Sequence, residues 1–313
     1  MMSDFVIRHY NPLVDLSNLS RVLTEIESVD RDGEDTSEEY LLTSLEWPNY
    51  RPDKDVWIVE LDGQLVGYGV ALEQPSQRCT LYVAVHPSQR QKGLGSQLLE
   101  LVLTRAHEMG SKNMLIYANE HNPASNLFLK QHSFVSVGSS GAMQTPDLFE
   151  IPSLDLPIGF KLKKYSEVND PRILLSALDD CYLDMWGHQH NDQRTEEELR
   201  SPRFLKYYAS DDILLLCDLQ NTVCGICSVK PKGKKDGNGS ILDLLDAPGV
   251  IKAYREQGYQ HQLVLAGIQH LRKKDSRPIR LEFWGDGEFA LNIYRELGFE
   301  MLNHYIAYHK EWK

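Results

Sequence analysis

Apolar and polar positions change their period along the chain, and each change marks an expected element. The stretch 56–60 is largely apolar, and 80–85 is almost continuously so, which is typical of a strand buried on both faces. Between them, 64–72 alternates less regularly around Gly67 and Gly69. From Leu94 to Ala106 the apolar residues recur at helical spacing instead. The pattern predicts three strands followed by a long helix.

The same succession is written twice in the 313 residues. The matching stretches are 5–19 with 160–174, 36–41 with 195–200, 56–72 with 213–229, and 128–134 with 293–299. Because the order is kept, we predict two similar domains, 1–150 and 160–313, joined by a linker at 151–159. Each is expected to be an α/β unit with a strand, one or two helices, three strands, a long helix, a strand, a helix and a final strand. Pro152 and Pro157 favour an extended linker.

Charge is distributed unevenly along the chain, whose net charge is −12. Residues 1–150 carry 21 acidic against 11 basic side chains, and nine of the acids lie in Glu25–Glu46. Nucleic acid binding needs a basic surface, so nucleic acid is not expected as a partner. The acidic segment is either a solvated face or a surface that attracts a cationic partner.

Three features of the sequence favour a cytoplasmic protein. No window approaches eighteen consecutive apolar residues, the N-terminus lacks the apolar core of a signal peptide, and the five cysteines are an odd number. Cys224 and Cys227 have CxxC spacing, but they fall in an expected strand, where residues three apart point to opposite faces. We therefore expect buried structural cysteines and no membrane association.

The stretch 87–99, PSQRQKGLGSQLL, places a glycine turn between a strand and a helix. Unpaired amides at a helix N-terminus favour an anion, and glycines let backbone approach a phosphate closely. Arg90 and Lys92 add positive charge. A Walker A loop is absent, and Leu98 stands where the dinucleotide fingerprint needs its third glycine.

What remains is Arg90-x-x-Gly93-x-Gly95 after a strand, which resembles the acetyl-CoA pyrophosphate loop of the GCN5-related N-acetyltransferases (GNAT). A second family motif, an Asn-led helix ending in Phe, is matched at Asn122 and Phe134. The resemblance covers essentially the whole chain as two tandem copies, an arrangement similar to that of mycothiol synthase-like proteins.

The resemblance implies a fold and a cofactor. Each domain should hold a mixed, mostly antiparallel twisted sheet flanked by helices, in which the fourth and fifth strands splay apart around the pantetheine arm of acetyl-CoA. The cofactor-binding residues it implies are Val83, Val85, Arg90, Gln91, Lys92, Gly93, Leu94, Gly95, Ser96 and Asn122.

The N-terminal copy departs from the family at its catalytic positions. Cys79 stands where many members have a Glu that acts as the catalytic base. Leu129 stands where the family has a Tyr that protonates the CoA thiolate. A water relay to Glu120 or His121, or to the acids of Glu25–Glu46, is the alternative path for the proton.

The C-terminal copy departs in its loop. Gln260 replaces the small residue beside the phosphate, and Glu256 places a negative charge there. Tyr294 nevertheless occupies the family's Tyr position, so it is a candidate catalytic acid as well as a candidate core residue. Asp243 and Asp246 are candidate bases on the preceding strand.

One further cluster, Asp184–Asp192, holds two histidines and two aspartates. His188 and His190 would share a face only in a strand, whereas this stretch follows a helical run, so no metal site is expected. Trp186 could line a substrate pocket there.

These observations predict an acetyl-CoA-dependent N-acetyltransferase that acts on a small, cationic primary amine in the N-terminal domain, as a monomer or homodimer. Two alternatives stay open. Catalysis could take place in the C-terminal domain around Tyr294, or the protein could bind acyl-CoA without catalysis.

Overall fold

A computed structural model describes residues 5–33, 35–44, 50–74, 77–146, 151–182, 209–235, 241–255, 257–272 and 277–312. By internal contacts the chain divides into two units, Met1–Val137 with Ile306–Lys313, and Gly138–Tyr305. We call them unit 1 and unit 2 and describe each by itself.

Unit 1 contains a sheet in the strand order β1-β2-β3-β4-β5-β13. Its strands are β1 (Phe5–His9), β2 (Val56–Leu61), β3 (Gln64–Gln74), β4 (Arg78–Val85), β5 (Asn113–Asn119) and the end of β13 (Glu300–Glu311). Its helices are α1 (Pro12–Asp30), α2 (Glu38–Ser44), α3 (Pro52–Asp55), the 3-10 turn η1 (Pro87–Gln89), α4 (Leu94–Glu108) and α5 (Pro123–Gln131). Neighbours from β1 to β4 are antiparallel, whereas β4 and β5 are parallel.

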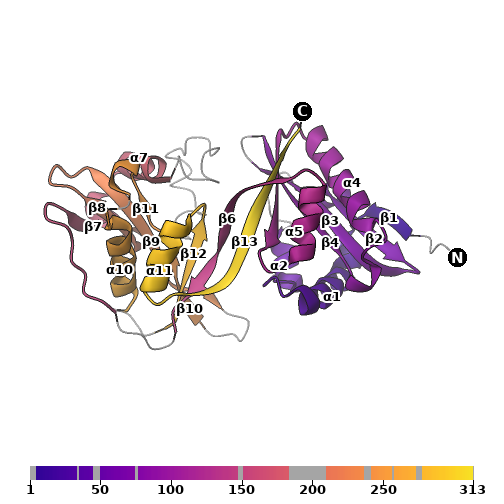
Figure 1. Ribbon diagram of the computed structural model, residues 1–313, viewed down its shortest axis with the longest axis horizontal. Coiled ribbons are helices and arrows are strands. Elements are labelled where there is room, and N and C mark those ends of the chain that lie inside the picture. The colour runs from indigo at the N-terminus through magenta and orange to yellow at the C-terminus, as the bar shows by residue number, and fades with distance from the viewer. Residues whose placement is uncertain are drawn as a thin grey trace. The chain divides into compact units, whose positions relative to one another are not determined.

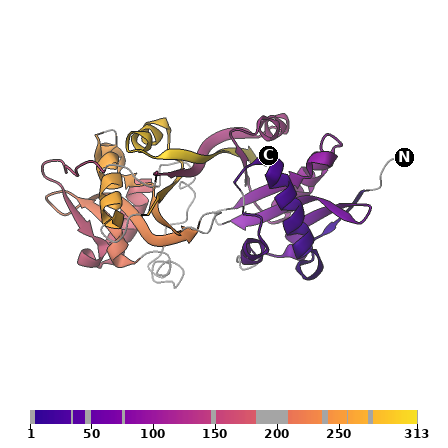
Figure 2. The same cartoon turned by 90° about the horizontal axis from the view of Figure 1, so that it is seen from below.

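Helices cover both faces of this sheet (Figures 1 and 2). On one face α1 buries Leu19, Val22, Leu23 and Ile26 against side chains of β2 and β3. On the other, α4 buries Leu94, Leu98, Leu99, Val102 and Ala106 together with side chains of β4 and β5. The helical spacing from Leu94 to Ala106 is therefore confirmed. The 80–85 strand packs between two layers as expected, but only Leu81 and Ala84 are buried and its other four residues are partly exposed.

Unit 2 repeats this order of elements with a strand order of β6-β12-β10-β9-β8-β7, and β11 pairs with β9. Its strands are β6 (Val135–Gln144), β7 (Lys161–Lys164), β8 (Ile213–Cys217), β9 (Val223–Lys235), β10 (Ile241–Asp246), β11 (Gly249–Val250), β12 (Ile279–Trp284) and the start of β13. Its helices are α6 (Tyr165–Val168), α7 (Pro171–Tyr182), η2 (Ser210–Asp212), η3 (Lys252–Tyr254), α10 (Tyr259–Arg272) and α11 (Glu288–Glu296). The predicted layered α/β class with two similar halves is confirmed.

The division into units differs from the predicted boundaries at 150 and 160. Strand β6 pairs with β12 over Ser140–Gln144, which groups Gly138 onward with unit 2. The last eight residues, Ile306–Lys313, group with unit 1, where Tyr308 is fully buried and donates from its Oη to Asn126 Oδ1 at 2.8 Å. Pairing of strands far apart in the sequence, which local patterns do not encode, sets these boundaries.

We expect a fragment of residues 1–150 to be less stable than the intact unit 1, because it lacks Ile306–Lys313 and leaves the edge of β5 and the core around Asn126 uncovered. Circular dichroism melting would measure this. A synthetic peptide of residues 300–313 should raise the fragment's melting temperature. A fragment that melts cooperatively at the same temperature with and without the peptide would contradict the role of this strand.

Candidate active site

The glycine turn of unit 1 forms an open helix N-terminus. Strand β4 ends at Val85, η1 follows, and Gln91 and Gly93 both have left-handed backbone, with φ of 64° and 83°. Helix α4 then begins at Leu94 with Gly93 as its N-cap, so that no side chain caps its first amides. The amide groups of this first turn and the positive end of the helix dipole together favour an anion.

The surface at the two glycines is open enough for a phosphate. A Cβ at Gly93 would meet nothing within 4 Å, and the nearest atoms to one at Gly95 would be those of the Phe128 ring, at 3.5 Å, and Val85, at 3.9 Å. The residues present therefore fit the pyrophosphate of acetyl-CoA.

Strands β4 and β5 stop pairing halfway along their length. The last paired residues are Leu81 and Ile116, although β4 continues to Val85 and β5 to Asn119. Val83 and Val85 lie on the part of β4 beyond this pairing. The divergence is the one that the resemblance implies around a pantetheine arm.

Arg90 is held by two protein groups, through all three of its guanidinium nitrogens. Its Nε donates to the Val85 carbonyl at 3.0 Å, and its two Nη groups donate to the carboxylate of Asp30 at 2.8 and 2.5 Å. Lys92 is exposed, and its Nζ donates to Gln89 Oε1 at 2.6 Å. The Arg90 guanidinium is thus engaged within the fold, whereas the Lys92 ammonium lies at the surface of the loop.

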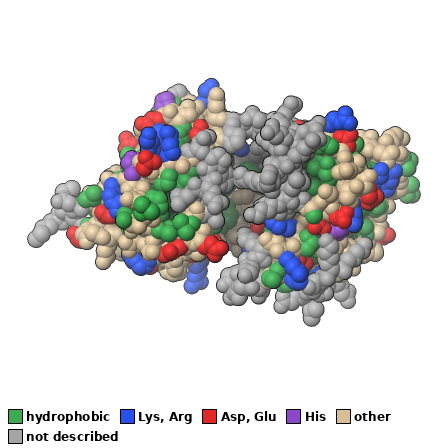
Figure 3. Space-filling view, turned by 180° about the vertical axis from the view of Figure 1, so that it is seen from behind, with side chains coloured by type: hydrophobic (Ala, Val, Ile, Leu, Met, Phe, Trp, Pro, Cys, Tyr) green, Lys and Arg blue, Asp and Glu red, His purple; other side chains and the backbone are tan. Residues whose placement is uncertain are grey.

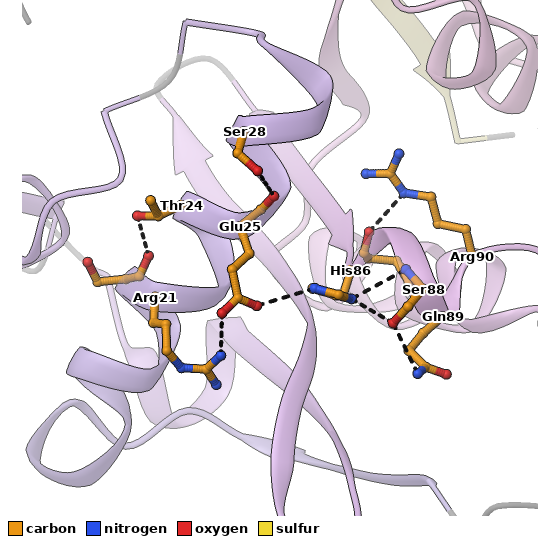
Figure 4. A network of polar contacts seen from close by, with 10 residues as sticks. Arg21, Thr24, Glu25, Ser28, His86, Ser88, Gln89 and Arg90 are labelled. Carbon is orange, nitrogen blue, oxygen red and sulfur yellow. Dashed lines mark hydrogen bonds and ion pairs between the residues drawn. The ribbon is translucent and has the colours of Figure 1, made fainter.

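A polar network joins the same loop to α1 (Figure 4). The imidazole of His86 lies between Glu25, with Nε2 3.2 Å from Oε2, and Ser88, with Nδ1 2.8 Å from Oγ. Glu25 also accepts from Arg21 at 2.6 Å. Because the Ser88 amide donates to His86 Nδ1 at 3.3 Å, that nitrogen acts as the acceptor and Nε2–H faces Glu25. Local sequence reasoning missed this pair, since Glu25 and His86 are far apart in the chain.

Asp32 is an acid of Glu25–Glu46 that contacts the start of α5. It follows α1, is half-buried, and hydrogen-bonds the side chain of Asn122 at the start of α5. Burial, with the nearby carboxylates of Asp30 and Glu27, raises the pKa of Asp32 to about 6, against the opposing effects of Asn122 and Arg90. A carboxyl group with this pKa can exchange a proton near neutral pH.

The other predicted site residues of unit 1 have structural positions. Asn122 caps α5, its Oδ1 accepting from the Ser125 amide at 3.1 Å. Glu120 is exposed in the turn after β5. Cys79 and Leu129, which replace two familiar catalytic side chains, are both buried, and burial raises the pKa of the Cys79 thiol to about 12.

In unit 2 the corresponding place is filled by side chains. Gln260, the second residue of α10 as Gly95 is of α4, donates from its Nε2 to Tyr294 Oη at 2.9 Å. Tyr294 is fully buried and donates to Asp286 Oδ1 at 2.8 Å. Burial raises the pKa of Asp286 to about 6, and burial with Asp286 raises the pKa of Tyr294 well above its usual value. Glu256 lies outside the described residues.

The strand preceding this loop is likewise occupied. Tyr182, at the end of α7, donates to the Ala247 carbonyl at 3.0 Å and accepts from the Gly249 amide at 2.8 Å. A Cβ at Gly249 would lie 2.6 Å from its ring. Asp243, one candidate base, is buried and accepts from the Lys232 amide at 2.7 Å.

The described part of the chain contains no candidate metal site and no candidate membrane-spanning helix. All five cysteines are buried and free, and no group of three or more His, Cys, Asp or Glu has metal-binding geometry among the residues described. The cluster Asp184–Asp192 lies outside them. No described helix combines the length and the apolarity that a membrane crossing requires. On the described part of the face in Figure 3, basic side chains are scattered among acidic ones.

Comparisons with known proteins agree with this geometry. Residues 20–134 match the model of the acetyltransferase (GNAT) family. A mycothiol acetyltransferase of Corynebacterium glutamicum is 26% identical over 294 residues, which cover 92% of each chain. One of Saccharopolyspora erythraea is 24% identical over 249 residues, covering 76% of this chain and 79% of that protein.

Solved structures show the same fold along the whole chain. A GCN5-related N-acetyltransferase from Sphaerobacter thermophilus has a TM-score of 0.76 at 18% identity, covering 98% of this chain and 95% of that one. A tandem GNAT protein from the clavulanic acid biosynthesis pathway has a TM-score of 0.63 at 15% identity and covers 98% of each chain. The expected tandem GNAT fold is confirmed. Residues 20–134 are thus a domain of the acetyltransferase (GNAT) type, and the protein is an acetyl-CoA-dependent N-acetyltransferase.

Proposed function

We propose that unit 1 holds acetyl-CoA and transfers its acetyl group to a small, cationic primary amine. The observation that carries this assignment is the open N-terminus of α4, with Gly93 and Gly95, beside the divergence of β4 and β5. The main-chain amides from Gln91 to Ser96 would bind the pyrophosphate, and the β4 edge at Val83 would pair with the pantetheine arm. Acetyl-CoA supplies an activated thioester.

The acceptor is proposed to be cationic because acids gather where α1 ends. Glu25, Glu27, Asp30 and Asp32 come from its last turns and the residue pair that follows it. Such a group of carboxylates attracts and orients an ammonium ion. The curated relatives are named for mycothiol, a small molecule, which favours a small acceptor over a protein.

Asp32 is our candidate for the group that takes the proton from the acceptor ammonium. An amine attacks a carbonyl only in its neutral form, so a base must act first. Asp32 hydrogen-bonds Asn122 and is stabilised in its ionised form by the charge of Arg90, and its pKa of about 6 leaves it ionised at neutral pH yet more basic than an ordinary carboxylate. Glu120, the earlier candidate in this unit, lies exposed in its turn and stays a proposal of lower priority.

Catalysis in unit 2 around Tyr294 is the second candidate. Its support is the Tyr at the family's position, and Asp286 next to it. The buried hydrogen bonds of Tyr294 with Asp286 and Gln260 favour a structural role instead. Non-catalytic acyl-CoA binding is disfavoured because residues 20–134 match a family of acetyltransferases.

A reciprocal exchange between the units tests the cofactor site. Gly95→Gln, which installs the residue of unit 2, should abolish acetyl-CoA binding measured by calorimetry, since the side chain would fill the phosphate position. Gln260→Gly should leave one site per chain with unchanged affinity. Gly95→Ala is the control for helix geometry, because a Cβ there makes only ordinary contacts. Two sites in the wild-type protein, or tight binding by Gly95→Gln, would place the cofactor elsewhere.

Replacing Asp32 by Asn should lower kcat by about 10²–10⁴-fold, the range of general acid–base groups. In the wild type, kcat/KM should rise as the pH passes about 6 and Asp32 ionises, and this limb should disappear in the variant. Asp35→Asn, in the exposed part of the same loop, is the matched control.

Although Asp32→Asn should lower kcat, it should raise the stability of the fold at neutral pH. The pKa of Asp32 is about 6 in the folded protein and 3.8 in the unfolded chain, so the folded state binds the proton more tightly. Ionisation of Asp32 therefore lowers the stability as the pH rises from about 4 to about 6. Asp32→Asn should melt higher than the wild type at pH 7 and equally at pH 4. A lower melting temperature at pH 7 would count against this assignment.

Tyr294→Phe separates the two units as sites of catalysis. If Tyr294 is structural, the variant keeps kcat and loses about 1–3 kcal/mol of unfolding free energy, because the buried Asp286 loses a donor. Steady-state kinetics and urea denaturation measure the two quantities. A hundredfold fall in kcat without loss of stability would move the active site into unit 2.

A further inference from the structure

The first arginine of the cofactor loop has the same bonding in both units. Arg90 Nε donates to the carbonyl of Val85, five residues earlier, at 3.0 Å. Arg255 Nε donates to the carbonyl of Val250, also five residues earlier, at 2.9 Å. Each arginine follows a 3-10 turn and comes three residues before a glycine with left-handed backbone, at 83° in Gly93 and 86° in Gly258.

The guanidinium group in each unit also reaches the end of the unit's first long helix. Arg90 binds the carboxylate of Asp30, the last residue of α1, through both Nη atoms. Arg255 Nη2 donates to the carbonyl of Cys181, the residue before the end of α7, at 3.1 Å. Strand end, loop and helix end are thereby joined by one side chain in each unit.

Unit 2 keeps this geometry although its loop has lost the open phosphate position. Gln260 fills the place of Gly95 and bonds to Tyr294. If the arginine served only to contact phosphate, this arrangement would have no role in unit 2. Its persistence indicates that the arginine supports the loop itself.

The charge around Arg90 leads to the same conclusion. The Asp30 side chain is only 13% exposed and neutralises the guanidinium with a bidentate ion pair, the strongest form of such a contact. A phosphate placed on Arg90 would also face this carboxylate. Lys92, whose ammonium lies at the exposed surface, has no carboxylate within ion-pair distance among the described residues.

We propose that Arg90 is a positioning residue: with Asp30 and the Val85 carbonyl it fixes the loop whose amides bind the pyrophosphate, and it does not itself bind phosphate. The same bond ties the cofactor loop to the acidic end of α1, so that the cofactor side and the acceptor side of the site are held together. This inference rests on the proposed placement of acetyl-CoA in unit 1.

Asp30→Asn distinguishes the two roles by the sign of its effect on acetyl-CoA affinity. If Arg90 positions the loop, the variant loses the ion pair, and the Kd and KM for acetyl-CoA should rise by about tenfold with kcat much less affected. If Arg90 binds phosphate, removing a nearby negative charge should lower both constants. Calorimetry with acetyl-CoA and steady-state kinetics give the two readouts, and a lowered or unchanged Kd would overturn the proposal.

Arg90→Lys and Arg90→Gln supply the matched pair. Lysine keeps the charge but cannot make the forked contact, whereas glutamine keeps an amide donor for Val85 without charge. We expect Arg90→Lys to weaken binding at least as much as Arg90→Gln, and Arg90→Lys with Asp30→Asn to weaken it no more than the stronger single variant. Near-normal binding by Arg90→Lys alone would indicate a phosphate ligand.

Ionic strength gives a readout that loss of stability does not change. Salt screens the attraction between a cation and phosphate, so the slope of Kd against salt should be the same in the wild type and in Arg90→Gln if Arg90 binds no phosphate. A shallower slope in the variant would contradict the proposal. Arg255→Gln is the control in unit 2 and should leave acetyl-CoA binding unchanged. If Gly95→Gln also binds normally, the placement of the cofactor fails rather than the role of Arg90.

Discussion

Two parallel strands that stop pairing halfway leave backbone groups without their usual partners, and the candidate site of unit 1 is built around that constraint. In unit 1, β4 and β5 pair only from Arg78 to Leu81, and the four remaining residues of β4 continue past the last pair. Unpaired main-chain groups are costly unless something else bonds to them. Here one carbonyl is satisfied by Arg90, and the edge at Val83 is the place proposed for the cofactor.

In unit 2, side chains of the unit itself bond to the corresponding region. Tyr182 bonds to the carbonyl of Ala247 and the amide of Gly249, and Gln260, Tyr294 and Asp286 form a buried polar group at the head of α10. These contacts stabilise the fold where unit 1 stays open. The proposed assignment therefore gives one architecture a binding role in unit 1 and a structural role in unit 2, with few changes at the loop.

The arginine at the start of each loop is common to both units. Because Arg90 and Arg255 make the same bond to a strand-end carbonyl, the path of the loop does not depend on the residue at position 95 or 260. At the helix end, Arg90 binds the Asp30 carboxylate and Arg255 donates to the Cys181 carbonyl. The carboxylate brings the acidic end of α1 beside the loop, where a cationic acceptor would be attracted.

The sequence by itself determined the elements, the repeat and the loop. Apolar periodicity located α4 and β4, and the order of glycines and basic residues predicted the cofactor loop, because these features are local. Residues 5–9 and 56–61 could be recognised as strands, but their pairing could not be read from them.

Only the tertiary structure decided which residues meet: Asp30 with Arg90, Glu25 with His86, Asp32 with Asn122, and Tyr308 with Asn126. Each of these pairs joins positions between 60 and 182 residues apart, and no local pattern encodes such contacts. Burial likewise decided the pKa of Asp32 and the structural setting of Tyr294, since a side chain's solvent exposure depends on what the rest of the chain packs against it.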